Sequence, residues 1–191
     1  NWVPVEQMYG TAAAERYAWL VGLARAAGAN VLRVWGGGLI ETETFYDLCD
    51  RAGMLVWQEM PQSSSALDNE PSREPAFVAR MQQVARSCIR RRGGHPSLAL
   101  WGGGNELTAA GEMPLQPLDE AHPCLAAIAR AAAEEHPNLP YVPTSPLGPS
   151  FDIDLAAVGR GRHHDVHGPW KYQGPVEHYR LFNANDCLFH G

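Results

Sequence analysis

The amino-acid sequence predicts an α/β fold, and within that class an incomplete (β/α)8 (TIM) barrel. Short apolar runs without clean alternation, typical of parallel strands buried on both faces, alternate along the chain with amphipathic helical patterns. Polar, glycine and aromatic residues repeatedly follow directly after those runs. A barrel gathers functional residues at the carboxyl ends of many parallel strands, whereas a doubly wound sheet concentrates them at one switch point. The pattern therefore favours the barrel.

Helical periodicity predicts four helices, over residues 11–27, 42–53, 75–92 and 119–135. Thr42 is a typical N-cap and Gly53 a typical helix stop, while Phe77 and Met81 mark the inward face of the third helix. Strands are predicted at 31–35, 54–57 and 98–101, and shorter ones at 141–146, 164–167 and 187–190.

Counting these units predicts that the barrel is not closed. If "NWVP" at residues 1–4 ends a first strand, the six later runs are strands two to seven. A closed barrel needs eight strands and typically about 250 residues. We therefore expect residues 1–191 to form a partial barrel as one domain. The oligomeric state is not predicted.

Composition limits the classes of partner and site that we expect. The formal net charge of -6 argues against nucleic acid, because phosphate binding needs a basic face. No apolar run of about 18 residues and no signal peptide is visible in the chain, so we expect no membrane span and a cytoplasmic location. The four cysteines (Cys49, Cys88, Cys124 and Cys187) form no CxxC pair, which argues against a disulfide framework or a cysteine zinc site.

The stretch "SLALWGGGNEL" (97–107) places three glycines before Asn105 and Glu106. A Glu at the end of a buried strand can keep its proton through desolvation and a neighbouring carboxylate, as a general acid requires. An Asn amide beside it offers both a donor and an acceptor to a sugar hydroxyl. The alternative is that Glu106 caps the next helix, and the local sequence leaves both interpretations open.

Tryptophans add to this pattern. Trp35, Trp57, Trp101 and Trp170 all fall at or just after predicted strand ends. Core packing explains any one of them, but several at one rim suggest stacking against sugar rings.

Three segments carry a resemblance to a known family. "NVLRVWGGGLIETETFYDLCDRAGMLVWQEM", "HPSLALWGGGNEL" and "HHDVHGPWKYQG" resemble, in order, the catalytic barrel of the glycoside hydrolase family 2 β-mannosidases. The resemblance implies a retaining exo-glycosidase that removes terminal β-D-mannosyl residues from β-mannosides or oligosaccharides, without a cofactor. It assigns Glu106 as the acid/base and Asn105 as a contact to the 2-hydroxyl.

The resemblance also implies a set of substrate-binding residues around that pair. Glu59 stands where many relatives carry Asp. The full expected set is Arg33, Trp35, Glu59, Trp101, Asn105, His164, Asp165, His167 and Trp170.

A retaining mechanism needs a second carboxylate about 5–5.5 Å from the first, acting as nucleophile. In the family that Glu follows a His and a small residue, and this chain reads "CLFHG" at 187–191. The nucleophile is thus expected directly after Gly191, and we expect the chain by itself to be inactive. Asp165 or Glu59 could instead activate water in an inverting scheme, which needs a separation of about 6.5–9.5 Å.

Other chemistries have less support. "HHDVH" (163–167) invites a metal interpretation, but three ligands so close along one strand rarely converge on one ion, so a hydrogen-bonding wall and no metal are expected. Lys171 is the single lysine and follows a loop, which disfavours Schiff-base chemistry. The alternatives to a β-mannosidase are a non-catalytic carbohydrate-binding fragment and another family 2 exo-glycosidase, such as a β-glucosaminidase.

Overall fold

The computed structural model describes residues 1–63, 69–111, 114–162, 164–168, 170–182 and 189–190. Within them the α-helices are α1 (Ala14–Ala26), α2 (Glu43–Ala52), α3 (Pro75–Arg92), α4 (Pro123–Glu135) and α5 (Pro175–Phe182). The strands are β1 (Val31–Val34), β2 (Leu55–Glu59), β3 (Leu98–Gly102), β4 (Tyr141–Val142), β5 (Asp165–Val166) and β6 (Phe189–His190). Two short 3-10 helices occupy Tyr9–Thr11 and Leu155–Ala157.

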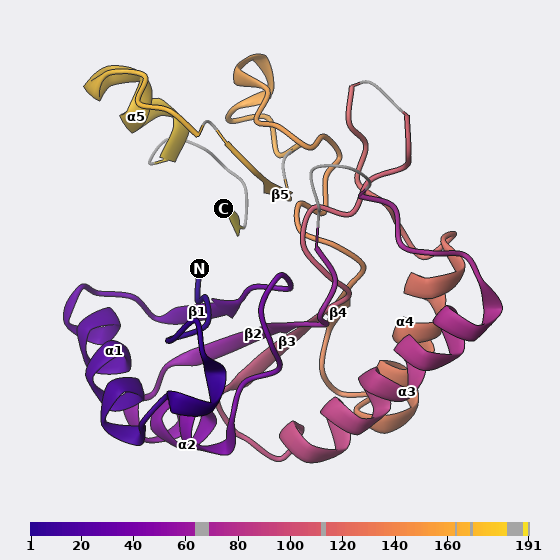
Figure 1. Ribbon diagram of the computed structural model, residues 1–191. Helices are drawn as coiled ribbons and strands as arrows, with labels where there is room; N and C mark the ends of the chain where they lie inside the picture. The colour runs from indigo at the N-terminus through magenta and orange to yellow at the C-terminus, as the bar shows by residue number, and fades with distance from the viewer. Residues whose placement is uncertain (64–68, 112–113, 163, 169, 183–188, 191) are drawn as a thin grey trace.

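The strands follow the order of an open barrel. β1 to β4 form one parallel sheet in sequence order, and β5 pairs in parallel with β6 (Figure 1). Trp2 adds a parallel bridge to Val34 beside β1. Trp2 and the six strands correspond to the seven predicted strand positions, so the incomplete (β/α)8 barrel is confirmed. Cys187 and Gly191 lie outside the described residues.

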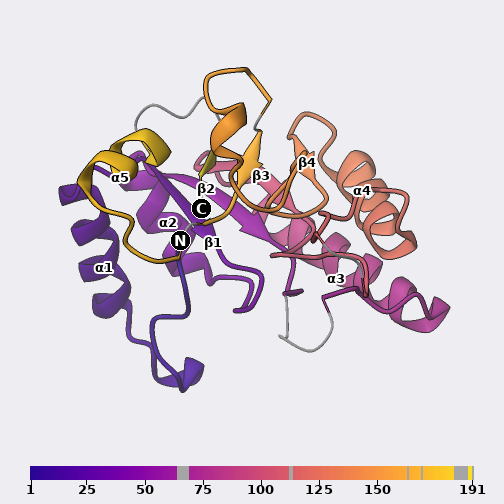
Figure 2. The same ribbon diagram turned by 90° about the horizontal axis from the view of Figure 1, so that it is seen from above.

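The helices cover one side of the sheet. α1 packs on α2 and α3 on α4, and all four lie on the same side of β1 to β4, whereas α5 lies across from them (Figures 1 and 2). The core between the layers includes Phe45, Tyr46, Val56 and Ile128, each fully buried. Of the described cysteines, all three are buried and free. No helix among the described residues has the length and apolarity needed to cross a membrane.

Local sequence signals explain where α2 begins and ends. The Thr42 hydroxyl accepts a hydrogen bond from the Phe45 N–H, and Gly53 ends the helix in the left-handed conformation at φ 65°. Both features were predicted, because an N-cap satisfies a free helical N–H and glycine tolerates positive φ.

Three predicted boundaries or faces were wrong. The fourth helix begins at Pro123, not near residue 119, because His122 caps it by accepting from the Cys124 N–H. The strand predicted at 141–146 ends at Val142, since the prolines that follow have no N–H for a ladder. Phe77, predicted to face inward, is 37% exposed in the first turn of α3.

Two further elements differ from the prediction. The strand predicted at 164–167 is limited to Asp165–Val166, and that predicted at 187–190 is described only at Phe189–His190. The helix α5 was not predicted, although Pro175 stands in its first turn, where proline is favoured.

Candidate active site

The glycines after β3 allow three strand ends to meet. A Cβ atom on Gly103 would lie 2.2 Å from the carbonyl oxygen of Pro143, which follows β4. One on Gly104 would lie 2.8 Å from the carbonyl oxygen of Gln62, which follows β2. Real Cβ atoms do not approach carbonyl oxygens this closely, so the absence of a side chain is what permits the packing.

Backbone hydrogen bonds then hold the next two residues at this junction. The Asn105 N–H donates to the Gln62 carbonyl at 2.9 Å, and the Glu106 N–H donates to the Ser145 carbonyl at 2.6 Å. Glu106 has φ 53°, the one positive φ of a non-glycine residue among those described. Such a conformation costs on the order of 1 kcal/mol and marks sites whose surroundings impose it.

Arg33 organises the floor of the site from β1. Its guanidinium donates to Glu59 Oε1 through Nε at 2.9 Å and Nη2 at 2.7 Å, and Nη2 also donates to Asn105 Oδ1 at 2.6 Å. Glu59 Oε2 accepts from the Gly36 N–H at 2.7 Å, and Asn105 Nδ2 donates to Ser63 Oγ at 3.1 Å. The amide of Asn105 is therefore fixed in orientation from both ends.

The Glu106 side chain lies against β5. Its Oε1 is 2.8 Å from His167 Nδ1, and the other ring nitrogen of His167 is 3.0 Å from Ser145 Oγ. The Glu106 side chain is 24% exposed, whereas that of His167 is 4% exposed. Glu106 thus presents a carboxyl group to solvent at one end of a buried hydrogen-bonded chain.

Two buried carboxyl groups flank this arrangement. Burial raises the pKa of Glu59, while the charge of Arg33 and the Gly36 N–H oppose the shift by favouring the ionised form. Burial likewise raises the pKa of Asp165, against a hydrogen bond from Ser145. Asp165 Oδ2 also accepts from the Leu147 N–H at 3.2 Å. Both carboxyl groups hold the scaffold in place.

Comparison with known proteins decides the family. Residues 23–122 match the glycosyl hydrolases family 2, TIM barrel domain. The chain belongs to glycoside hydrolase family 2. It is 36% identical to the β-mannosidase of Mus musculus over 106 residues, which cover 56% of this chain and 12% of that protein. It is 28% identical to β-mannosidase B of Thermothelomyces thermophilus over 198 residues, covering 96% of this chain and 22% of that protein.

A solved structure agrees with this assignment. The β-D-mannosidase of Dictyoglomus thermophilum superposes with a TM-score of 0.71 at 26% identity, over 95% of this chain and 25% of that one. The predicted resemblance to family 2 β-mannosidases is confirmed. The chain spans between an eighth and a quarter of the length of these relatives.

The family 2 barrel brings together only some of the predicted site residues. Arg33, Glu59 and Asn105 form one network, and Glu106 and His167 form a second beside it. The remaining predicted residues are placed differently.

Trp101 does not line the site, and this prediction was wrong. It is fully buried on the helix-facing side of β3, where its indole N–H donates to His136 after α4. Side chains alternate along a strand, so the neighbour that faces inward is Leu100, which pairs with Trp57 of β2. The Arg33 guanidinium lies 5.1 Å from the Trp57 ring centroid, so Trp57 supports the site floor.

Trp170 and Trp35 line two separate hollows. Trp170 is 68% exposed and borders a hollow of about 370 Å³ whose wall includes His167, Asp152 and Lys171. Trp35 lines another of about 320 Å³ with residues from the N-terminal segment.

His164 was expected on the cleft wall, but its side chain is exposed outside β5. The strand pairing covers only the two residues that follow it. The rim of the site is thus formed by residues from several segments instead of one row along β5.

Ser63 and Ser145 were missed by sequence reasoning. Each contacts a site residue through its hydroxyl, Ser63 to Asn105 and Ser145 to His167. Their position could have indicated this role, because both follow directly after strands of the sheet, the second and the fourth, and functional residues lie at the carboxyl ends of parallel strands.

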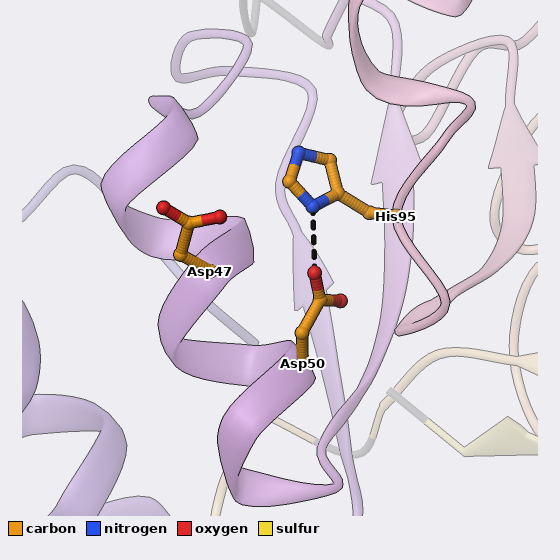
Figure 3. A group of neighbouring side chains, drawn as sticks. All are labelled: Asp47, Asp50 and His95. Atoms are coloured by element: carbon orange, nitrogen blue, oxygen red, sulfur yellow. Dashed lines mark hydrogen bonds and ion pairs between the residues drawn. The ribbon is translucent and has the colours of Figure 1, made fainter.

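The group of possible metal ligands that the described residues form lies outside the "HHDVH" segment (163–167), of which His163 is not among the described residues. Among the described residues, one group has its ligand atoms within 4.8 Å of one another, namely Asp47, Asp50 and His95 (Figure 3). It lies near the amino end of β3, away from Glu106. The two His95 nitrogens contact Asp50 at 2.7 Å and Glu43 at 2.9 Å, so these residues link α2 to the segment after α3.

Proposed function

We propose that this chain forms the acid/base half of the active site in a β-mannosidase-like retaining exo-glycosidase. The observation that carries the proposal is Glu106, a partly exposed carboxyl group held by His167 beside an oriented Asn105. A protonated Glu106 would donate to the glycosidic oxygen as the bond breaks, and its carboxylate would then take a proton from water. The terminal β-D-mannosyl unit is inferred from the β-mannosidase relatives.

Asn105 suits a role in holding the sugar. Its Oδ1 accepts from Arg33 and one of its amide hydrogens goes to Ser63, which leaves a second amide hydrogen for a substrate hydroxyl. Because Arg33 is itself held by Glu59, the amide is oriented before substrate arrives. Such preorganisation lowers the cost of ordering the site on binding.

A retaining mechanism also needs a second carboxylate, and β6 supports a place for it beside Glu106. This strand runs parallel to β5 with His190 opposite Val166, so its carboxyl end points to the same rim as His167 and Glu106. A carboxylate at this rim would face Glu106, as a retaining mechanism requires. Glu59 and Asp165 are poor substitutes, because their oxygens accept hydrogen bonds from the scaffold.

Hydrolysis of 4-nitrophenyl β-D-mannopyranoside by the chain and its Glu106→Ala variant tests the proposal. The assays are run with and without azide, a small nucleophile that can attack the anomeric carbon where the enzymic carboxylate is missing. We expect azide-dependent release of nitrophenol with formation of α-mannosyl azide, and its loss in Glu106→Ala. The loss should be smaller for the 2,4-dinitrophenyl mannoside, whose better leaving group needs less protonation.

Two controls make the result specific. Glu74→Ala removes an exposed carboxylate at the start of α3 and should behave as wild type. The 4-nitrophenyl β-D-glucosaminide, assayed in parallel, should react at least tenfold more slowly. Turnover without azide that needs Glu106 would place the nucleophile inside the chain. Absence of any azide-dependent turnover in a folded chain would refute the acid/base role, and faster reaction of the glucosaminide would refute the mannoside assignment.

A further inference from the structure

We propose that Ser145 and His167 form a positioning relay that holds Glu106 in both of its protonation states. This inference rests on the proposed function, in which Glu106 alternates between acid and base. It concerns how a single carboxyl group keeps its orientation while its proton leaves and returns. Neither serine nor histidine touches substrate in this proposal, and both act through Glu106.

The relay is built from three contiguous groups of graded burial. Ser145 Oγ lies 3.0 Å from His167 Nε2, and His167 Nδ1 lies 2.8 Å from Glu106 Oε1. Ser145 and His167 are 1% and 3% exposed, so the inner part of the chain is closed to water. Of the three, Glu106 has the most exposed side chain, at 24%.

The imidazole ring is fixed in place by its surroundings. The backbone N–H of His167 donates to the Phe151 carbonyl at 3.0 Å, and the backbone carbonyl of His167 accepts from the Ile153 N–H at 3.3 Å. The ring packs edge-on against the Phe151 ring at a centroid distance of 5.9 Å. The ring nitrogens therefore keep their two partners without a ring flip.

Ser145 also holds the backbone of the residue that it serves. Its carbonyl accepts from the Glu106 N–H at 2.6 Å, while its hydroxyl contacts the ring that contacts the Glu106 carboxyl. The two connections close a loop from the backbone of Glu106 to its side chain. The positive φ of Glu106 is thereby imposed from the same point that orients the carboxyl.

The chemistry of the three groups allows the hydrogen bonds to reverse. When Glu106 is ionised, His167 Nδ1–H donates to it and Nε2 accepts from the Ser145 hydroxyl. When Glu106 is protonated, its O–H donates to Nδ1, and Nε2–H donates to the Ser145 oxygen. A hydroxyl is both donor and acceptor, and neutral imidazole has two tautomers, so the three groups stay paired with one another in both states. When Glu106 is ionised, the Ser145 hydroxyl turns from Asp165 to His167, and Asp165 keeps its hydrogen bond from the Leu147 N–H.

Charged groups around the ring bear on this exchange. Glu59 and Asp165 interact electrostatically with His167. Arg33 interacts with both of these carboxyl groups, and Asp152 and Lys171 line the hollow beside the ring. These are the charged groups that face the exchange, whereas the hydrogen-bonded chain determines which tautomer accompanies each state of Glu106.

The test is a pH titration of the full chain by NMR, with ¹⁵N-labelled histidine and ¹³C-labelled glutamate side chains. His167 signals are assigned by their absence in His167→Asn, and Glu106 signals by their absence in Glu106→Ala. We expect Nδ1 of His167 to change from proton donor to proton acceptor at the same pH at which Glu106 takes up its proton. A ring that keeps one tautomer, or stays doubly protonated across that titration, overturns the relay.

Serine variants separate the relay from simple packing. Ser145→Ala should lose the coupling of the His167 tautomer to Glu106, and Ser145→Thr, which keeps the hydroxyl, should restore it. Ser150→Ala removes a hydroxyl from a half-buried loop residue that donates to the Asp152 carbonyl and takes no part in the relay, and it serves as control. Retained coupling in a folded Ser145→Ala chain overturns the role of the serine.

The titration needs no turnover, so its result is independent of the glycosidase assays. A chain that shows azide-dependent turnover without the tautomer exchange keeps the proposed function and loses the relay.

Discussion

Replacing Glu59 by Gln should destabilise the protein strongly, because it leaves the Arg33 charge buried without its counter-ion. The Arg33 and Glu59 side chains are 8% and 0% exposed. Glu59 accepts three hydrogen bonds, two from Arg33 and one from the Gly36 N–H. Gln keeps one acceptor oxygen, so its amide group must face either the guanidinium or the Gly36 N–H, donor against donor.

The expected cost follows from these contacts. Removing one partner of a buried ion pair typically costs about 3–5 kcal/mol. With a urea dependence of roughly 1–3 kcal/mol per molar for a small protein, a loss of about 3 kcal/mol lowers the unfolding midpoint by about 1 M or more. Far-UV circular dichroism during urea unfolding measures this shift.

A surface pair provides the matched control. Glu177 and Arg180 form an ion pair on α5 with side chains 38% and 52% exposed. Glu177→Gln should cost less than about 0.5 kcal/mol, because exposed pairs contribute little. The double variant Arg33→Met with Glu59→Gln should be destabilised by at least about 1 kcal/mol less than the sum of the two single changes. A Glu59→Gln cost no larger than that of Glu177→Gln would refute the buried network.

Three further changes test the fold around the site. Gly103→Ala should lower the thermal unfolding temperature by several degrees, because the new Cβ would lie 2.2 Å from a backbone carbonyl oxygen. Gly94→Ala should leave that temperature unchanged, because a Cβ there meets nothing within 4 Å, and equal effects of the two changes would contradict the close approach. Trp101→Ala should cost about 3–5 kcal/mol in urea unfolding, but Trp170→Ala less than about 0.5 kcal/mol; the reverse order would mean that the buried and exposed tryptophans are exchanged. Two arginines of α3 lower the pKa of Glu135 to about 2 by hydrogen bonding. The ion pairs between these arginines and Glu135 therefore stabilise the folded state above about pH 4.5, and this stabilisation is lost as the pH falls toward 2. Between pH 6 and pH 3 the unfolding temperature of wild type should therefore fall further than that of Glu135→Gln, and parallel curves would contradict the ion pairs.

The pairing of Arg33 with Glu59 depended on the tertiary structure. The sequence placed both at strand ends, and parallel strands bring such residues to one rim. It could not say that their side chains would bond to each other and to Asn105. That outcome requires the parallel register, in which Arg33 lies opposite Trp57 and Glu59 opposite Gly102. Gly102 leaves room for the carboxylate, since a Cβ there would lie 2.9 Å from Glu59 Cγ.

The sequence by itself determined the fold class, the family and the position of Glu106, because periodicity and glycine placement are local properties of the chain. Only the tertiary structure decided which side chains share a face. Trp101 and Trp57 look alike in sequence, yet strand alternation directs one to the helices and the other to the site floor. The contact of His167 with Glu106 joins residues 61 positions apart. No local pattern encodes such a contact, because it exists only when the ends of β3, β4 and β5 converge.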